Sequence, residues 1–520
     1  METLNYNAYS ANVTRNKRLI PPAPALNQNA RAGAGLALPF RARDNLHVNG
    51  GIYARIIECR RIVVGCKICM KIVILGAGVT GSSVAGALAS EENDIVVIDQ
   101  KPHLLTALKS RLDIAVIEGN ATHPTILAQA GVKDADMVIA VTDRDETNML
   151  ACHVINTLYN KPKTIARVRA LDFLNHPQLF APGGIDIVIS PEQIITESLH
   201  NLVRFPGALH VSEFANGLVR LFSIRVAATG FLTGKRIHAV KEQLADDMIR
   251  VAAIFRNGAA IAVNGEAVIA TGDEVFFMGP RDKVRKTLSA LHKLDDPIRT
   301  VMIAGGGHVG KRLAMALESK HQVKVIELDA ARAKDIANSL RNTMILNGDC
   351  TDEALLREEM IENMDLFCAL TNNDGINLIS AGLAKKLGAR RAICLVNNNA
   401  YLKLVEGADI DVAIQPKLET LGSILKHVRK CDVAGVSSVC GGSAEAIEAI
   451  AHRGKHSSSV VGLRVDQVNL PDGVILGALI RENEVIPVHH DTVFAEGDHV
   501  VMFALNKRLI KAIEGFFQPI

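Results

Sequence analysis

The sequence from residue 70 onward consists of two similar halves, and this internal duplication constrains the fold more than any other feature. Four pairs of segments match at offsets of 225–229 residues: 72–81 with 301–310, 135–142 with 364–371, 251–256 with 476–481, and 272–278 with 497–503. The two halves are called copy one (70–290) and copy two (298–520). Because the repeat spans whole halves, a chain of 520 residues is expected to hold two similar sets of domains rather than one core.

The first part of each copy alternates short apolar runs with amphipathic stretches. The runs lie at 72–75, 95–98, 114–117, 137–141, 164–168 and 185–189, and again at 301–304, 323–326, 343–346, 366–370, 392–396 and 410–414. Buried strands separated by helices are typical of a parallel, doubly wound sheet. We therefore predict an α/β fold with Rossmann-like, nucleotide-binding domains over 70–195 and 298–418.

The second part of each copy has a different pattern. Short apolar strands alternate with Gly-Asp turns such as Gly272-Asp273 and Gly497-Asp498. This pattern predicts a small α+β domain after each doubly wound sheet, over 206–290 and 431–520.

The amino-acid composition excludes several classes of protein and partner. Hydrophobic residues make up 48% and charged residues 22%, the balance of a soluble globular protein. Aromatic residues are only 4%, with no Trp, and the net charge is +3, so a nucleic-acid partner is not expected. Nine cysteines suit a reducing cytosol better than a disulfide framework. The longest apolar candidate, 62–79, is interrupted by lysines and glycines, so we expect no membrane span.

The first 69 residues differ from the rest. They hold 10 Lys and Arg against 3 Asp and Glu, and they show no sustained apolar period before Ile52. Three interpretations stay open: a disordered extension, a cleaved targeting peptide, or a mis-assigned start with translation beginning at Met70. We favour the third, because a buried strand opens directly after Met70. Cys66 and Cys69 form a C-x-x-C, but no second such pair follows to complete a zinc site.

The chemistry lies on two glycine loops. Gly76-x-Gly78-x-x-Gly81 follows a predicted strand and opens a predicted helix. The first glycine allows a tight turn, the second lets the backbone approach a pyrophosphate, and the third lets helix and strand pack closely. The helix start then offers free N–H groups to phosphates. Asp99 ends the next strand, where a carboxylate accepts hydrogen bonds from a ribose and repels a 2′-phosphate, which favours NAD or an adenine nucleotide.

Copy two repeats the same constellation. Its counterparts are Gly305, Gly307, Gly310 and Glu327. Thr142 and Thr371 end the fourth predicted strands, at the edge where ligands of such sheets bind, although Thr142 could equally cap the following helix. Arg167 and Arg169 lie at the fifth strand, and either contact with a phosphate or surface ion pairing remains open for them.

What the sequence lacks also matters. A hydride-transfer enzyme needs a substrate domain with a general acid or base, and the small predicted domains leave little room for one. The sequence has no G-x-x-x-x-G-K-[ST] motif, so P-loop hydrolysis is unsupported. We therefore expect a binding protein without a catalytic residue or metal, and keep an NAD-dependent dehydrogenase as the alternative.

Several segments beyond the glycine loops resemble the TrkA family of regulatory subunits of bacterial Trk potassium-uptake systems. They are Ile74-Leu-Gly-Ala-Gly78, Asp143-Arg-Asp-Glu-Thr-Asn148, Ala166-Arg-Val-Arg169, Phe205-Pro-Gly-Ala-Leu209, Val251-Ala-Ala-Ile-Phe-Arg256, His427-Val-Arg-Lys, Gly435-Val-Ser-Ser and Ala444-Glu-Ala-Ile-Glu-Ala449. The resemblance covers about residues 70–518. It implies two tandem regulator-of-potassium-conductance units that bind NAD(H) or ATP/ADP. It also implies a homo-oligomeric ring on the cytoplasmic face of an integral-membrane potassium-translocating subunit.

The resemblance also implies a set of ligand residues. They are Gly76, Ala77, Gly78, Val79, Thr80, Gly81, Asp99, Thr142 and Arg167 in copy one, and Gly305, Gly306, Gly307, His308, Val309, Gly310, Glu327 and Thr371 in copy two. Copy two departs from copy one at the fifth strand, where Leu395 and Asn397 replace the two arginines, and Gly375 replaces Glu146. We therefore expect copy one to bind nucleotide more tightly.

Overall fold

The structure is a computed structural model. It describes residues 70–517, apart from 91–92, 160–161, 181–183, 245–247, 292–295, 408, 430–431 and 453–457. Residues 1–69, with their three open interpretations and the Cys66–Cys69 pair, lie outside the described residues.

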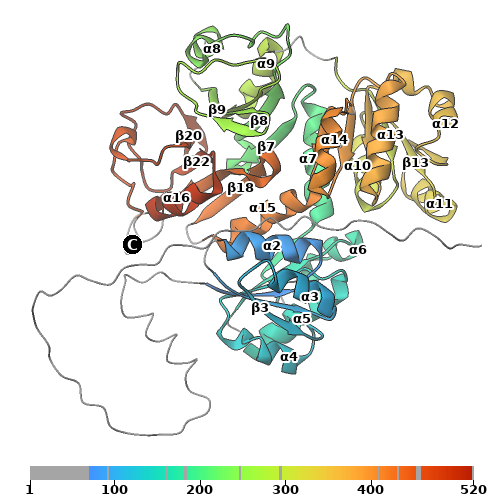
Figure 1. The fold of residues 1–520 in the computed structure, drawn as a ribbon, viewed down its shortest axis with the longest axis vertical. Helices are drawn as coiled ribbons and strands as arrows, with labels where there is room; N and C mark the ends of the chain where they lie inside the picture. The colour runs from blue at the N-terminus through green and yellow to red at the C-terminus, as the bar shows by residue number, and fades with distance from the viewer. Residues whose placement is uncertain are drawn as a thin grey trace, which may run out of the picture. The chain divides into compact units, whose positions relative to one another are not determined.

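Copy one begins with a six-stranded parallel sheet (Figure 1). Its strands are β1 (Lys71–Leu75), β2 (Asp94–Asp99), β3 (Ala115–Glu118), β4 (Met137–Ala140), β5 (Lys163–Arg167) and β6 (Ile187–Ile189). They run in the order β3-β2-β1-β4-β5-β6, the doubly wound Rossmann order. Ile72 and Ile74 pack on one face of β1, while Val73 and Leu75 pack on the other. Burial on both faces explains the unbroken apolar runs, and the predicted fold class is confirmed.

Helices cover both faces of this sheet. They are α2 (Val79–Ala89), α3 (Pro102–Lys109), α4 (Pro124–Gln129), α5 (Asp145–Tyr159) and α6 (Leu171–Leu174). The long helix α7 (Pro191–Arg204) follows β6 and leads to the next sheet.

Copy two builds the same sheet again, in the order β14-β13-β12-β15-β16-β17. The strands are β12 (Thr300–Ala304), β13 (Gln322–Glu327), β14 (Thr343–Asn347), β15 (Leu366–Ala369), β16 (Ala392–Leu395) and β17 (Val412–Ile414). Its helices are α10 (His308–Leu317), α11 (Ala330–Ser339), α12 (Glu353–Glu358), α13 (Asp374–Lys386) and α14 (Asn399–Gly407). Helix α15 (Pro416–Val428) is the counterpart of α7.

Each doubly wound sheet is followed by a five-stranded antiparallel sheet. The first holds β7 (His210–Phe214), β8 (Val219–Arg225), β9 (Arg250–Arg256), β10 (Ala259–Ile261) and β11 (Glu274–Pro280), with α8 (Ile237–Leu244) and α9 (Arg281–Leu291). The second holds β18 (Val433–Val439), β19 (Ala444–Ile450), β20 (Val474–Arg481), β21 (Glu484–Ile486) and β22 (His499–Ala504), with α16 (Ile510–Phe517). The two orders are β10-β9-β11-β8-β7 and β18-β19-β22-β20-β21.

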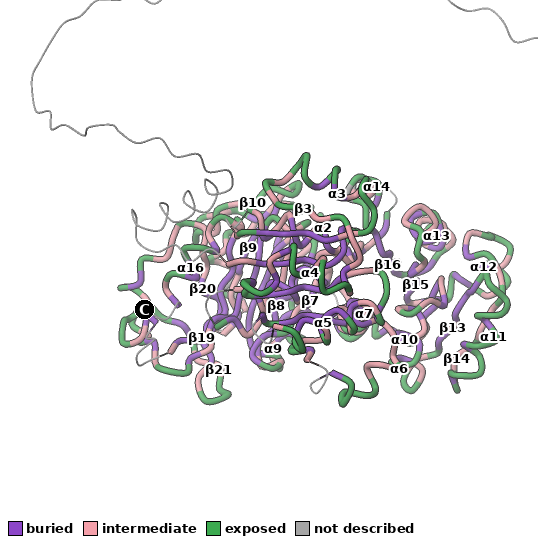
Figure 2. Tube along the Cα trace, turned by 90° about the horizontal axis from the view of Figure 1, so that it is seen from below, coloured by how far each residue is buried: buried purple, intermediate pink, exposed green. Residues whose placement is uncertain are grey.

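The Gly-Asp turns carry matched ion pairs. Asp273 accepts hydrogen bonds from Arg256, and Asp498 accepts them from Arg481, at 2.7–2.9 Å. Strands β8, β9, β11, β19, β20 and β22 are largely buried, whereas the edge strands β10 and β21 are not (Figure 2). Part of that burial is mutual, because Phe276 of the first sheet and Phe503 of the second share one apolar cluster with ring centroids 5.6 Å apart.

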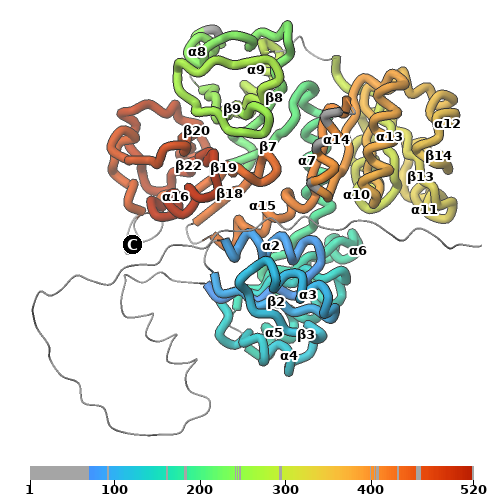
Figure 3. The backbone as a smooth tube through the Cα atoms, in the orientation of Figure 1, coloured from blue at the N-terminus to red at the C-terminus, as the bar shows by residue number. Residues whose placement is uncertain are grey.

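The two long helices α7 and α15 are exchanged between the copies (Figure 3). Leu421, Ile424 and Leu425 of α15 pack in the core beneath α2 of copy one. Ile195 and Leu199 of α7 pack in the core that includes the copy-two sheet. Each doubly wound sheet is therefore completed by a helix from the other copy, which the sequence repeat did not predict.

Candidate functional site

The two glycine loops have the same strained geometry. Gly76 has φ +107° and Gly305 has φ +102°, in the region that disfavours residues with a Cβ atom. A Cβ on Gly81 would lie 1.9 Å from the carbonyl oxygen of Gly76, and the same distance separates a Cβ on Gly310 from the oxygen of Gly305. The first and third glycines of each motif are therefore required by the turn and by the close helix–strand contact, as the spacing predicts.

The second glycine of each motif faces open space. A Cβ on Gly78 or Gly307 would meet no atom within 4 Å. Each residue is the N-cap of the following helix, α2 or α10, with φ −65° and ψ −169°. These positions therefore leave room for a group to approach the helix start, where backbone N–H groups are unpaired.

The acidic residues after the second strands hold the glycine loops in place. Asp99 accepts hydrogen bonds from the backbone N–H of Ala77 at 2.6 Å and of Lys101 at 2.8 Å. Glu327 accepts them from Gly306 and Asp329, both at 2.9 Å. The sequence suggested only a ribose contact, so this anchoring is an additional role that reasoning from the motif missed.

The two acids differ in exposure. Asp99 is part-buried and lines the cavity between the copies. Glu327 is only 5% exposed, also pairs with Arg332 at 3.3 Å, and is not among the residues that line that cavity. The longer side chain of Glu327 thus turns inward, and the structure does not bring it to the site that its sequence position suggested.

Thr142 and Thr371 are held by buried asparagines. The Thr142 hydroxyl donates to Oδ1 of Asn148 at 2.7 Å, and the amide group of Asn148 donates to the carbonyl oxygen of Arg167 at 2.9 Å. Asn377 makes the same bridge from Thr371 to Leu395. Thr142 is not the N-cap of α5, because that helix begins at Asp145; its hydroxyl donates to Asn148 and accepts a hydrogen bond from the backbone N–H of Arg144 at 3.4 Å, ahead of the helix.

Arg167 and Arg169 have separate surroundings. Arg169 ion-pairs with Asp145, its backbone N–H donates to Asp145 at 2.7 Å, and its guanidinium donates to the carbonyl oxygen of Asp143. Arg167 lies 3.8 Å from Glu192 at the start of α7, and its side chain is 18% exposed. Burial lowers the pKa of Arg167, and the nearby Glu192 carboxylate opposes that shift. A guanidinium stays protonated in proteins, so Arg167 is a cation. Arg169 is thus largely committed to the fold, while Arg167 faces the cavity.

One large cavity of ≈ 1740 Å³ joins the two copies. It is lined from copy one by Gly76, Gly78, Val79, Thr80, Asp99, Thr142 and Arg167, and from copy two by Gly306, Gly307, His308, Val309 and Thr371. Of the other predicted residues, Ala77, Gly81, Gly305, Gly310 and Glu327 lie behind these loops without lining it. Both loops therefore open on the same space.

The cavity wall is charged. Its cations are Lys101, Arg144, Arg167, Arg169, Lys311, Arg332 and Lys417, and its anions are Asp99, Asp143, Glu146, Glu192, Asp335 and Asp374. Cationic side chains beside two open helix starts suit an anionic ligand. The volume exceeds that of a site for one drug-sized ligand, about 300–1,000 Å³.

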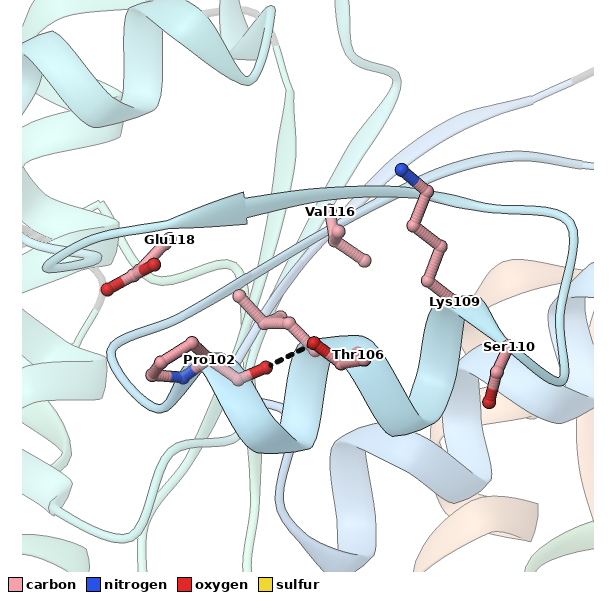
Figure 4. Close-up of a pocket in the computed structure, with 7 residues that line it drawn as sticks. Pro102, Thr106, Lys109, Ser110, Val116 and Glu118 are labelled. Carbon is pink, nitrogen blue, oxygen red and sulfur yellow. Dashed lines mark hydrogen bonds between the residues drawn. The ribbon is translucent and has the colours of Figure 1, made fainter.

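A smaller groove of ≈ 470 Å³ lies between α3 and β3 in copy one (Figure 4). Pro102, Thr106, Lys109 and Val116 line it, and the Thr106 hydroxyl is already bonded to the Pro102 carbonyl oxygen at 3.0 Å. No glycine loop reaches this groove, so the larger cavity is the candidate site.

Two further pairs support the site, and both recur at an offset of 229 residues. Asp145 and Asp374 accept the backbone N–H groups that follow the fifth strands, while Asn148 and Asn377 hold the threonines. Because both pairs recur in the two copies, the repeat itself carried a signal that could have identified them.

The residues in the cavity fit a dinucleotide. The open space above Gly78 and Gly307 leaves room for a pyrophosphate, and Asp99 lines the wall beside the first loop. The Nε atom of Arg167 is buried without a hydrogen-bond partner among the described residues, and so remains available to an anion.

Family models match the doubly wound sheet of both copies and the antiparallel part of copy two. The TrkA-N domain model matches residues 72–191 and 301–416, the two doubly wound sheets. The TrkA-C domain model matches residues 454–516, in the second antiparallel sheet.

Whole-length relatives carry one common name. The Trk system potassium uptake protein TrkA of Halomonas elongata is 46% identical over 451 residues, which cover 86% of this chain and 99% of that protein. The protein of the same name in Vibrio alginolyticus is 43% identical over 453 residues, with the same shares covered. Among solved structures, the GsuK channel bound to NAD superposes with a TM-score of 0.56 at 17% identity, over 90% of this chain and 83% of that one. The GsuK RCK domain gives 0.55 at 17%, over 89% and 99%.

Proposed function

The chain belongs to the TrkA family, and on this premise we propose that it is a nucleotide-binding regulatory subunit of a potassium-uptake system. It acts as a binding protein rather than as an enzyme. It lies in the cytoplasm, at the inner face of the cell membrane, as a homo-oligomeric ring on an integral-membrane potassium-translocating subunit. Among the described residues, no helix is both long and apolar enough to cross a bilayer.

The observation that carries this proposal is the shared cavity. Two glycine loops open on it, and its wall carries seven cationic side chains beside six anionic ones. NAD(H) is the proposed ligand, with ATP or ADP as the alternative, and it supplies an anionic pyrophosphate and a ribose rather than a reaction. In copy one, the backbone from Gly76 to Thr80 receives the phosphates, Asp99 accepts from the ribose, and Arg167 contacts a phosphate. In copy two, the loop from Gly305 to Val309 and Thr371 hold a second, weaker site.

The exchanged helices offer a route from ligand to transporter. Helix α7 starts at the copy-one cavity, packs on the copy-two sheet, and continues into the first antiparallel sheet. A ligand shifts the equilibrium between two conformations of the chain only by the difference between its affinities for them, typically about 1–3 kcal/mol per site. Several sites in a ring, acting together, are therefore needed for firm gating.

Co-purification tests this function. The full chain is expressed in its own cell, and the membranes are solubilised gently. When the chain is purified from them, an integral-membrane potassium transporter and bound NAD(H) or ATP should co-purify with it. In cells that lack potassium-translocating subunits, the chain should move to the soluble fraction. A chain that stays on those membranes, or that oxidises NADH with a panel of hydroxy acids and aldehydes, would contradict the proposal.

A further inference from the structure

One arginine of copy two reaches into copy one. Arg312 lies on α10 and is only 7% exposed. Its guanidinium donates to the hydroxyl of Ser190 at 3.2 Å and to the carbonyl oxygen of Arg169. Both acceptors belong to the copy-one sheet edge, beside the cavity. The matched position in copy one is Ser83, whose hydroxyl bonds to its own helix at Val79. The contact therefore runs in one direction only.

Arg312 lies close to the ion pair between Arg167 and Glu192, in which two polar atoms lack a hydrogen-bond partner within the described part of the chain. Glu192, two residues after Ser190, is 13% exposed and faces Arg167 across 3.8 Å. The Oε2 atom of Glu192 and the Nε atoms of Arg167 and Arg312 are buried, and none has a hydrogen-bond partner among the described residues. Buried charged groups that lack hydrogen-bond partners are energetically costly. They favour an arrangement in which a ligand supplies the missing hydrogen bonds.

The carboxylate of Glu192 acts on both arginines. Burial lowers the pKa of Arg312, whereas Glu192 and then Asp145 raise it. Glu192 is also the strongest charge that raises the pKa of Arg167. The Glu192 carboxylate therefore acts electrostatically on one guanidinium group from each copy, 3.8 Å from that of Arg167 and two residues after Ser190, which Arg312 contacts.

We propose that Arg312 is a positioning residue for the copy-one nucleotide site, and that it neutralises Glu192 when Arg167 turns to a phosphate. The proposal rests on the proposed function, because it assumes an anionic nucleotide in the cavity. Without Arg312, a phosphate contact by Arg167 would leave Glu192 buried and unpaired, which is strongly unfavourable. Arg312 removes that obstacle without touching the ligand.

Copy two has no equivalent of this arrangement. Copy two holds Leu395 in place of Arg167 and Lys417 in place of Glu192, and the copy-one residue that matches Arg312 is Ser83. The nucleotide affinity of copy one thus depends on a residue of copy two, while the reverse dependence is missing. Occupancy of copy one is also communicated to α10 through Glu192 and Arg312, which links the two doubly wound sheets.

The test is calorimetric titration of the full chain with NADH, and with ATP as a second probe. Arg312→Ser, which installs the copy-one residue, should weaken binding at copy one by about 10-fold. Adding Glu192→Gln to that variant should restore affinity to within about threefold, because the amide needs no cation. Arg312→Lys should retain affinity, since it keeps the charge.

Controls separate this role from a structural one. Ser190→Ala removes the hydrogen bond from Arg312 without changing a charge, and it should leave NADH affinity unchanged. If Arg312→Ser unfolds the chain, Arg312→Lys and Glu192→Gln still decide the matter, since Arg312→Lys must bind NADH as the unmodified chain does. An unchanged affinity in Arg312→Ser, or no rescue by Glu192→Gln, would overturn the proposal. Failure of the unmodified chain to bind either nucleotide would instead overturn the proposed function.

Discussion

The two copies share a scaffold and differ in the charges placed on it. Both have a left-handed first glycine, a third glycine pressed against a carbonyl oxygen, an acid that anchors the loop, and a threonine held by a buried asparagine. The cavity wall differs. Copy one presents Arg167 beside Glu192, whereas copy two presents Leu395 beside Lys417. Burial lowers the pKa of Lys417, while Asp374 raises it.

The comparison separates the residues that the fold requires from those that form the ligand site. The shared residues satisfy backbone groups at the sheet edge, so each copy needs them whether or not it binds a ligand. The differing residues face the cavity, where a duplicated gene is free to specialise. An arginine offers a forked set of donors to a phosphate, and a lysine offers one compact charge. Copy two is therefore expected to keep a weaker site rather than none.

The largest expected effect tests the shared scaffold. Gly81→Ala and Gly310→Ala place a methyl group 1.9 Å from a carbonyl oxygen, with the same distance in both copies. We expect each to lower the free energy of unfolding by about 3 kcal/mol and to abolish binding in its own copy. Urea unfolding of the two full-length variants measures this. A large loss in one and none in the other would break the equivalence of the two loops.

The next effect concerns the cavity wall. Arg167→Leu installs the copy-two residue, and it should weaken NADH binding at copy one by roughly 10- to 150-fold, because a charge-assisted hydrogen bond to phosphate is lost. Arg169→Ala is the matched control: Arg169 is bonded to Asp145 and Asp143, so it should affect stability more than affinity. Titration calorimetry gives both values, and equal affinity losses would remove the special role of Arg167.

The acids after the second strands should respond differently. Asp99→Ala is expected to weaken NADH binding by about 10-fold, since Asp99 lines the cavity and also holds the loop. Glu327→Ala should lower the unfolding midpoint, because a buried, paired carboxylate is lost, and should remove only a weak binding phase. Fluorescence titration with NADH separates the phases. A larger affinity loss in Glu327→Ala than in Asp99→Ala would reverse the assigned order of the sites.

The smallest effect involves the exchanged helices. Glu419 on α15 faces Ser198 on α7 at 3.4 Å, and burial raises its pKa to about 7 from 4.5. The folded chain therefore binds a proton more tightly than the unfolded chain, so stability declines as the pH rises from about 4.5 to 7. Because the side chain is only partly buried, we expect a change of about 1–2 kcal/mol.

Glu419→Gln should flatten this part of the pH profile, measured by urea unfolding at several pH values. The matched residue on α7 is Ile194, so copy one contributes no such slope from this position. An unchanged slope in the variant would place the titrating group elsewhere.

The sequence predicted the sheets well, because a strand buried on both faces must be apolar throughout. Each run, such as 72–75 or 301–304, forms a strand of a doubly wound sheet, as expected. The glycine geometry was also predicted, since a positive φ and a close backbone contact admit few other residues. The anchoring roles of Asp99 and Glu327 were missed, because a motif names a position but not the partner of each carboxylate oxygen.

The exchange of α7 and α15 could not be read from the sequence. The sequence of an amphipathic helix indicates that its apolar side must pack against a sheet. It does not indicate which copy supplies that sheet, because both copies offer a similar face. The position of Arg312 was hidden for the same reason, because its partners Ser190 and Arg169 lie in the other copy. The exchange also means that separately expressed halves would lack a covering helix, so binding experiments need the full chain.

The central claim is that copy one holds the high-affinity site, and two matched variants test it most directly. A Cβ on Gly78 or on Gly307 meets no protein atom within 4 Å, so Gly78→Ala and Gly307→Ala should fold alike while each obstructs a phosphate at its own loop. Titration calorimetry of the two full-length variants with NADH is the decisive measurement. We predict that Gly307→Ala keeps the tight phase and that Gly78→Ala loses it; tight binding in Gly78→Ala, or equal affinities in both variants, would contradict the claim.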